Sequence, residues 1–335
     1  MVPKDRAGRE LLRALFDKAV AVADPMRFIA ANLPDRAGAS RVVVVGAGKA
    51  SARMAEAVEA EWGPCEGLVI TRYGYGRPTA GIEIACAAHP VPDQAGVDAT
   101  RRMLDLLGGL GADDLVLILI SGGASALLCA PAGDMTLADK QAVNAGLLAS
   151  GAPIGQMNVL RKHLSRVKGG QLAAAAAPAR VLALMISDVP GDDPAMIGSG
   201  PTVGDGATRN EALAIVARWG IALPASAGRA LARETGVIAP GDARLSRVEN
   251  RIVAAPAQSL AAAAAQARAA GFGVEILGDD LDGEAREVAA AHAALALRVQ
   301  SGMRPGDTPR LILSGGELTV TRRGDGTGGP NAEYA

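Results

Sequence analysis

The chain has 335 residues, of which 49% are hydrophobic and 2% aromatic, and its formal net charge is −1. This length allows two domains with a sizeable core, and that core must consist of Ala, Val, Leu and Ile. Without a basic stripe the sequence gives no electrostatic support for nucleic-acid or anionic-membrane binding, and no apolar run approaches the roughly 20 residues of a membrane span.

The cysteines indicate the redox environment. Cys65, Cys86 and Cys129 are few and far apart, which favours reduced thiols over a disulfide framework or a zinc site. The first residues include Lys4, Asp5 and Arg6, and no signal peptide is visible. We therefore expect a cytoplasmic protein with neither a nucleic acid nor a membrane as partner.

Strands and helices are expected to alternate through the first part of the chain. Residues 8–33 predict one or two amphipathic helices. Strands are expected at 41–45, 68–71, 82–86, 115–120 and 181–186, and helices at about 50–62, 93–107, 136–150 and 154–176. This alternation predicts βαβ units, a largely parallel sheet and right-handed crossovers.

A second segment begins near residue 203 and contains helices before its first strand. We expect a strand at 251–254, a helix at 257–270, a strand at 273–277, a helix at 283–300 and two strands around Ser314-Gly315-Gly316 within 310–321. The predicted fold class is α/β, with a Rossmann-like parallel-sheet domain at 1–235 and a second, incomplete α/β domain at 236–335.

The last residues, 328–335, read as the first turn of a helix. Pro330 suits a first helical position, but a helix of five residues cannot bury an apolar stripe or hold itself together. We expect the sequence to stop inside an element.

Ligands of parallel sheets bind at the carboxyl ends of the strands, and the first such end carries Gly46, Gly48 and Lys49. Glycine permits close approach, free N–H groups at the helix start attract an anion, and Lys49 adds a positive charge. The alternative is a tight turn with a solvated lysine. Ser51 stands where the dinucleotide fingerprint has its third glycine, and the spacing is not that of a Walker P-loop.

Three further strand ends carry polar turns. Ser121-Gly122-Gly123-Ala124-Ser125 predicts an oxyanion or phosphate nest. Residues 187–193 are acidic, and Asp188 at the strand end can hold Mg²⁺ or accept a hydroxyl proton; the alternative is a capped, Asp-rich loop. Ser314-Gly315-Gly316-Glu317 echoes the second turn and adds a carboxylate.

Residues 158–170 form a basic segment on an expected helix. Either Lys162 or Lys168 points into an anionic site, or the segment is a solvated face. We expect His163 to be structural, whereas His89, at another strand end, suits either role. No His/Cys spacing predicts a metal site, and no Gly-x-Ser-x-Gly elbow predicts a hydrolase. Anion-binding turns, lysines and strand-end carboxylates together are what phosphoryl transfer needs.

Several of these motifs resemble the class II glycerate 2-kinase family, whose members carry a C-terminal MOFRL domain and often bear the name hydroxypyruvate reductase. The resemblance runs from about residue 8 to 335 through residues 46–51, 89–93, 119–127, 158–170, 187–192, 198–202 and 314–317. It implies that ATP phosphorylates D-glycerate to 2-phosphoglycerate with a divalent metal, Mg²⁺, in a cleft between two α/β domains.

The resemblance also implies site residues. Lys49 would neutralise the transferring phosphate, and Asp188 and Asp192 would be catalytic, holding the metal or orienting the glycerate hydroxyl. The expected nucleotide contacts are Gly46, Gly48, Ser121, Gly122, Gly123, Ser125, Lys162, Ser314, Gly315, Gly316 and Glu317.

Family members continue for several dozen residues past the stretch found here at 326–333, so a truncated second domain is expected. Two other interpretations stay open: an NAD(P)H-dependent hydroxypyruvate reductase, with Arg72 receiving an NADP phosphate, and an inactive remnant that binds a nucleotide. A homodimer is a possible assembly.

Overall fold

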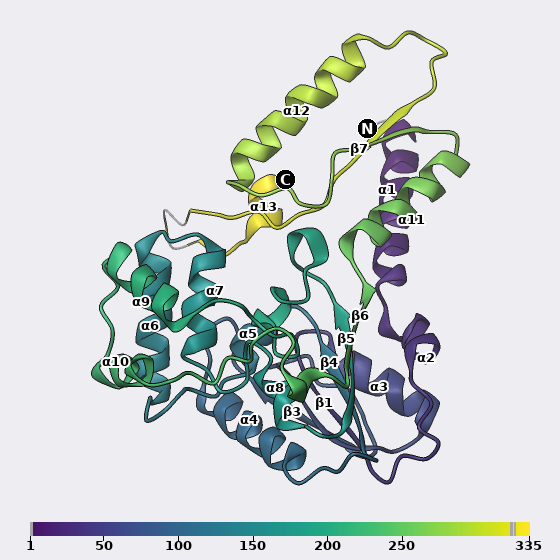
Figure 1. Cartoon of the computed structure of the whole chain (residues 1–335). Coiled ribbons are helices and arrows are strands. Elements are labelled where there is room, and N and C mark those ends of the chain that lie inside the picture. The colour runs from purple at the N-terminus through teal and green to yellow at the C-terminus, as the bar shows by residue number, and fades with distance from the viewer. Residues whose placement is uncertain (1–2, 322–323, 325) are drawn as a thin grey trace. The chain divides into compact units, whose positions relative to one another are not determined.

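The computed structural model describes residues 3–321, 324 and 326–335 (Figure 1). The chain forms two compact units: residues 25–188 with 192–253, and residues 1–24 with 189–191 and 254–335. The larger unit thus extends past the predicted boundary at 235/236, because the strand after that boundary hydrogen-bonds into the first sheet. The predicted domain assignment itself stays a prediction.

A six-stranded sheet forms the centre of the larger unit, in the order β3-β2-β1-β4-β5-β6. Its strands are β1 (Val42–Ala47), β2 (Glu66–Arg72), β3 (Ile82–Ala87), β4 (Leu115–Ile120), β5 (Arg180–Ile186) and β6 (Val248–Ala254). The pairs from β3 through to β5 are parallel. This confirms the predicted α/β, Rossmann-like class, and the order reverses between β1 and β4, where such folds bind ligands.

Helices cover both faces of this sheet. Figure 1 places α3 (Ser51–Trp62) and α4 (Gln94–Leu107) on opposite sides of it, and all six residues of β4 are buried. Asp93 caps α4 as predicted, because its carboxylate accepts the N–H of Gly96 at 3.0 Å. A short helix, α2 (Ile29–Asn32), packs on α3.

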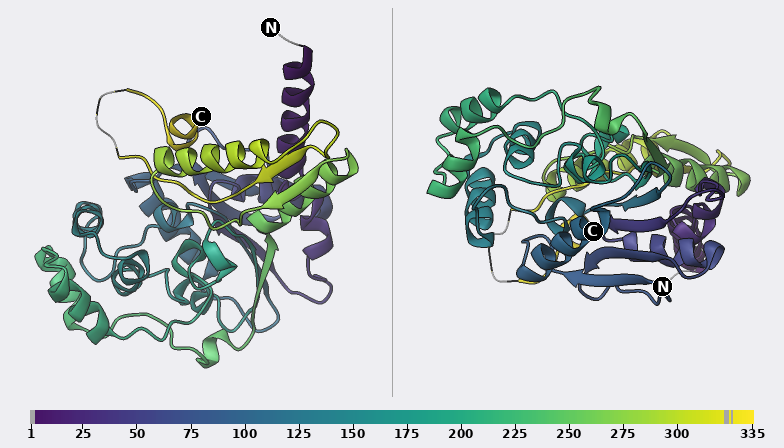
Figure 2. Two further views of the ribbon diagram at one scale, coloured as in Figure 1. Left: turned by 90° about the horizontal axis from the view of Figure 1, so that it is seen from above. Right: turned by 60° about the horizontal axis from the view of Figure 1, so that its bottom comes forward.

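Four helices share a second core, visible as the teal-to-green group in Figure 2. They are α6 (Leu137–Ser150), α7 (Ile154–His163), α9 (Arg209–Arg218) and α10 (Ala225–Ala232). The prediction of one helix over 154–176 is wrong. The chain leaves the helical conformation at Leu164, which has φ of −102° and ψ of 29°. It then turns at Gly169 and Gly170, whose φ angles are 57° and 78°, and the helical conformation resumes at α8 (Gln171–Ala175).

The smaller unit combines the two ends of the chain. Here α1 (Pro3–Val22) packs along α11 (Pro256–Ala269) through Leu15, Ala263 and Ala267 (Figure 1). Its other elements are α12 (Ala285–Ser301), α13 (Pro330–Tyr334) and the parallel pair β7 (Gly273–Ile276) and β8 (Arg310–Leu313). Among the described residues, no helix has the length and apolarity needed to cross a bilayer.

The second strand predicted after Ser314-Gly315-Gly316 is wrong. That segment forms only isolated bridges, Leu281 with Gly316 and Glu284 with Thr319. The chain here pairs with the loop after β7 at two separate points, and this pairing does not extend into a regular ladder.

Glu59, near the end of α3, fastens the loop that leads into β3. Its carboxylate accepts the N–H groups of Cys65 (3.2 Å), Ala80, Gly81 (2.7 Å) and Ile82 (2.7 Å). Burial raises the pKa of Glu59, but these hydrogen bonds outweigh burial and lower that pKa below its usual value.

Replacing Glu59 with Gln is expected to reduce the free energy of unfolding by about 1–2 kcal/mol at pH 7. Because the folded-state pKa is lowered, the wild-type advantage is complete above the ordinary value near 4.5 and disappears as pH falls through the folded pKa. Urea unfolding at pH 7 and pH 4 measures both effects. Glu61→Gln, at an exposed position of the same helix, is the matched control and should change little.

Candidate functional site

The turn after β1 is closed by its own protein contacts. The backbone N–H groups of residues 48, 49 and 50 donate, in that order, to the Ile70 carbonyl (3.0 Å), the Gly122 carbonyl (2.8 Å) and Ser121 Oγ (3.0 Å). For residues 48–50 the expectation of free N–H groups is therefore wrong, because neighbouring strands and the next turn supply acceptors. Lys49 is half-buried here, and only its side chain can serve a ligand.

Close packing requires Gly46, near the end of β1, and Gly48, in the turn that follows. A Cβ on Gly46 would overlap the carbonyl oxygen of Leu119, and one on Gly48, which has φ of 143°, would overlap Ser121 Oγ. Both glycines thus let the carboxyl ends of β1 and β4 approach each other. Their predicted contacts with a nucleotide stay predictions.

Ser121 and Ser51 tie the two strand ends together. Both are buried, their hydroxyl oxygens lie 3.1 Å apart, and Ser51 Oγ donates to the Leu119 carbonyl at 3.2 Å. The Ser121 hydroxyl therefore already has protein partners, and a role in phosphate binding stays a prediction.

The second turn gathers the chemically active side chains. Gly122 and Gly123 have no acceptor for their N–H groups among the described residues. A Cβ on Gly122 would collide with the carboxylate of Asp188, and one on Gly123 would lie 2.9 Å from His89 Nε2 and 3.2 Å from Lys49 Cε. The Asp188 carboxylate, the His89 imidazole and the Lys49 side chain thus lie around two backbone N–H groups that have no acceptor in the described chain. Such a pair of N–H groups suits an anion, and a strand-end carboxylate lies beside it.

A buried polar network continues from this turn. Ser125 Oγ lies 2.8 Å from Ser199 Oγ, and Ser199 Oγ lies 3.5 Å from Asn158 Oδ1, which accepts from Arg161 Nη1 at 3.3 Å. Lys168 Nζ donates to the Ser125 carbonyl at 2.7 Å. The backbone of Ser199 has φ of 65°, a value that residues other than glycine rarely adopt and that recurs at functional sites.

Lys162 is held in an ion pair. Its ammonium and the Asp205 carboxylate are in contact, with side-chain exposures of 5% and 15%, and Asp205 also accepts the N–H of Ala207 at 2.7 Å. Burial raises the pKa of Asp205, but the Lys162 hydrogen bond and that N–H lower it overall. To contact a nucleotide, the Lys162 ammonium would have to bind it while also paired with Asp205. The predicted contact stays a prediction.

The acidic turn places Asp188 at the surface and leaves Asp192 half-buried, with φ of 53°. Within the described residues no group of three or more His, Cys, Asp or Glu side chains could enclose a metal ion. This arrangement still fits Mg²⁺, which proteins often hold through one or two carboxylates while substrate phosphates and water complete its shell.

The fourth turn belongs to the smaller unit and is built by loop pairing. Gly315 N–H donates to the Gly278 carbonyl at 2.9 Å, and Glu317 N–H donates to the Leu281 carbonyl at 3.0 Å. Gly316 passes too close to Leu281 to carry a side chain. Ser314 and Glu317 are exposed, and the predicted nucleotide contacts of residues 314–317 stay predictions.

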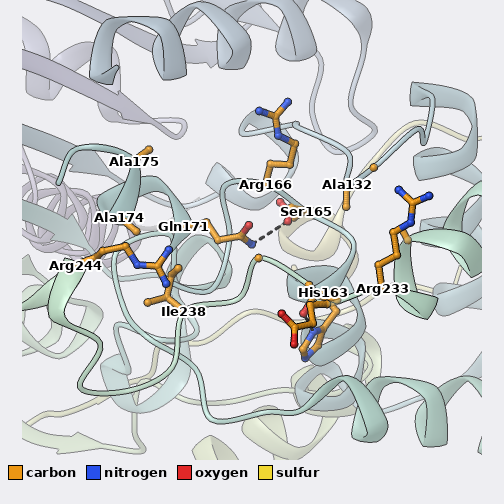
Figure 3. Close-up of a pocket in the computed structure, with 15 residues that line it drawn as sticks. Ala132, His163, Ser165, Arg166, Gln171, Ala174, Ala175, Arg233, Ile238 and Arg244 are labelled. Carbon is orange, nitrogen blue, oxygen red and sulfur yellow. Dashed lines mark hydrogen bonds between the residues drawn. The ribbon is translucent and has the colours of Figure 1, made fainter. Parts of the chain in front are cut away.

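A cavity of about 490 Å³ lies elsewhere in the larger unit, and no predicted site residue lines it (Figure 3). Two of its polar side chains bond within the protein: His163 contacts Thr235 Oγ1 (2.5 Å) and the Ala207 carbonyl (3.0 Å), and Gln171 Nε2 donates to the Ser165 carbonyl (2.8 Å). Burial lowers the pKa of His163. We place the candidate site at Gly122–Gly123, where the reactive groups meet.

Lys140 is a buried cation that the sequence analysis missed, since it stands inside a helix pattern without a motif. The side chain is 5% exposed, and Nζ has no hydrogen-bond partner among the described residues. Burial lowers the pKa of Lys140 to about 8; burial, followed by the charge of Lys140, lowers the pKa of Lys168 to about 7. The scarcity of lysine, six in the chain, is the one sequence signal that could have drawn attention to it.

Comparison with known proteins gives consistent relatives. Residues 11–232 match the family described as a domain of unknown function, DUF4147. The chain is 37% identical over 330 residues to a D-glycerate 2-kinase of Thermotoga maritima, covering 98% of this chain and 78% of the relative. It is 51% identical over 338 residues to an Agrobacterium vitis protein provisionally named hydroxypyruvate reductase, covering 100% of this chain and 76% of the relative. A crystal structure of Thermotoga maritima glycerate kinase aligns with a TM-score of 0.84 at 36% identity, covering 98% of this chain and 78% of that one.

Replacing Lys140 with Met removes a buried ammonium that has no hydrogen-bond partner in the described chain, so the free energy of unfolding should rise by about 1–4 kcal/mol at pH 7. Native Lys140 titrates near pH 8, whereas the unfolded lysine titrates near 10.5. The charged Lys140 therefore lowers the wild-type free energy of unfolding fully below pH 8, and this loss disappears as pH rises to 10.5. The difference in the free energy of unfolding between Lys140→Met and wild type should decrease over the same range. Urea unfolding of both proteins between pH 6.5 and 10 measures this; Lys18→Met, at an exposed position, is the control.

Proposed function

This chain belongs to the glycerate 2-kinase family, and we propose that it transfers the γ-phosphoryl group of ATP to D-glycerate, giving 2-phosphoglycerate and ADP. Family membership rests on the matched domain and on relatives more than 30% identical along almost the whole chain. The observation that carries the proposal is the meeting of Lys49, His89 and Asp188 around the open amides of Gly122 and Gly123.

Phosphoryl transfer is catalysed mainly by positioning and by neutralising the charge on the transferring group. The N–H groups of Gly122 and Gly123 are fixed donors without protein acceptors in the described chain, and the Lys49 stem passes beside Gly123. We assign the γ-phosphoryl group to this nest, with the Lys49 ammonium balancing its charge.

Asp188 acts on the other side of the same nest. Two roles suit a strand-end carboxylate here: it binds Mg²⁺, or it orients the glycerate hydroxyl and accepts its proton. Asp192 is the second carboxylate available to the metal. Bound Mg²⁺ would supply charge neutralisation at the phosphate oxygens.

The reductase reading receives less support from the same geometry. A dinucleotide-binding turn needs open amides at the first strand end for the pyrophosphate. In this chain those amides donate to Ile70, Gly122 and Ser121, and Arg72, the residue considered for an NADP phosphate, stacks on the Tyr75 ring at 4.0 Å. The ATP substrate and three free cysteines also support a cytoplasmic location, which we propose.

Two substitutions test the proposal. Lys49→Met and Asp188→Asn should each lower kcat for ATP-dependent glycerate phosphorylation by about 10²–10³-fold, because each removes a charge that acts on the transferring group or its acceptor. ADP release and phosphorus NMR of the product measure rate and regiochemistry. Lys18→Met is the matched control and should retain wild-type kcat.

A reductase activity in place of a kinase activity would contradict the proposal. Oxidation of NADH or NADPH by hydroxypyruvate in the absence of ATP, together with no phosphoglycerate from the wild-type protein, would overturn the kinase assignment.

A further inference from the structure

Two buried lysines, Lys140 and Lys168, form a basic cluster with the half-buried Arg161, and Lys168 contacts the end of the second turn at the Ser125 carbonyl. They come from α6, α7 and the loop before α8; the charge of Arg161 acts on both lysines, and the charge of Lys140 acts on Lys168. Lys140 and Lys168 are 5% and 1% exposed, and burial lowers the pKa of all three cations. The cluster lies outside the set of residues to which the proposed mechanism assigns a role.

The cluster lacks a counter-ion among the described residues. Lys162, next along α7, has Asp205 to itself, whereas no carboxylate pairs with the cluster. The acid that acts on Lys140 and Lys168 is the Cys129 thiol, and burial raises the pKa of that thiol, so it supplies no negative charge at pH 7. Buried basic groups without an anion are costly in a protein interior, and such groups are ordinarily paired or bind a charged ligand.

Individual hydrogen bonds leave the cluster under-satisfied. Lys168 donates to the carbonyls of Ser125 (2.7 Å) and Leu128 (3.4 Å), and Arg161 donates to Asn158 Oδ1 at 3.3 Å. Lys140 Nζ has no hydrogen-bond partner in the described part of the chain. Arg161 has a forked set of donors, of which Nη1 alone has an acceptor among the described residues, and such a fork matches the two oxygens of a carboxylate.

Hydroxyl and amide groups adjoin these cations. The chain Arg161–Asn158–Ser199–Ser125 links the cluster to the second turn, and Ser199 is held there in its rare backbone conformation. In a ligand that carries a carboxylate beside hydroxyl groups, the carboxylate would pair with a cation of the cluster, and the hydroxyl groups would hydrogen-bond to serine or asparagine. A hydroxy acid has that composition, whereas the phosphate-binding groups are those around Gly122 and Gly123.

We propose that Lys140 and Arg161 bind the carboxylate of the hydroxy-acid substrate, with Asn158 and Ser199 positioning its hydroxyl groups. Lys168 supports this subsite by holding the carbonyls that follow the second turn. The proposal deepens, and rests on, the assigned glycerate kinase activity: it divides the site into a phosphoryl nest at Gly122–Gly123 and an acid-binding subsite at the basic cluster.

A substrate-binding role and a purely structural role predict different behaviour of Lys140→Met. In both cases removal of the unpaired ammonium leaves the ligand-free protein at least as stable as the wild type. Only a binding role makes the same substitution abolish stabilisation by the substrate. The experiment is thermal unfolding of the full chain with D-glycerate and no ATP, for wild type, Lys140→Met, Arg161→Gln and Lys18→Met.

We expect D-glycerate to raise the Tm of wild type and Lys18→Met in a dose-dependent way, and to leave Lys140→Met and Arg161→Gln unshifted. ATP should raise the Tm of all four proteins equally. Glycerol at the same concentration, which lacks the carboxylate, should reproduce no part of the glycerate shift. If inorganic phosphate reproduces the shift and competes with glycerate for it, the cluster is a phosphate site and the proposal is overturned.

Steady-state kinetics give the second measurement and cover a variant that folds poorly. The KM for D-glycerate should rise at least about tenfold in Arg161→Gln, with partial recovery in Arg161→Lys, while the KM for ATP stays within about twofold of wild type. Unchanged glycerate KM in both Arg161→Gln and Lys140→Met would sink the inference and leave the kinase assignment intact. If glycerate binding depends on Lys140 but the wild-type protein has no kinase activity, the kinase assignment is overturned and the acid-binding subsite is retained.

Discussion

The contact between the carboxyl ends of β1 and β4 is the constraint on which the rest of the site depends. Gly46 and Gly48 lack the side chains that would separate these strands, and the Ser51–Ser121 pair locks them together. The same contact uses up the amides of the first turn. The second turn is thereby held beside Lys49, and the N–H groups of Gly122 and Gly123 have no acceptor among the described residues. Close packing at the first turn thus leaves the second turn able to bind an anion.

The charges of the larger unit follow a consistent arrangement around that turn. Asp188 borders Gly122 on one side, and Lys49 and His89 border Gly123 on the other. The same unit holds Lys140, Arg161 and Lys168, whose removal from water is unfavourable for folding alone. Retention of such groups is typical of sites where stability is given up for function.

Much of the fold could be predicted from the chain, because buried β-branched runs and their glycine punctuation are local signals. Val42–Val45, Leu115–Ile120 and the Asp93 cap were all identifiable in this way. The convergence of Lys49, Gly122 and Asp188 was predictable too, since parallel strands end at one edge of their sheet. The helix break after His163 and the bridged loop at Gly316 were not, because backbone conformations there depend on distant partners such as Ile238 and Leu281.

The amino-acid sequence by itself determined the α/β class, the strand ends that carry polar turns, and the kind of chemistry those turns suit. Tertiary structure alone decided which amides stay open, that Lys162 is paired with Asp205, and that Lys140 is buried with no hydrogen-bond partner in the part of the chain that the structure describes. The reason is physical: whether a donor is satisfied or a charge is desolvated depends on groups from other elements, 43 positions along the chain in the case of Lys162 and Asp205. Local pattern has no access to those groups.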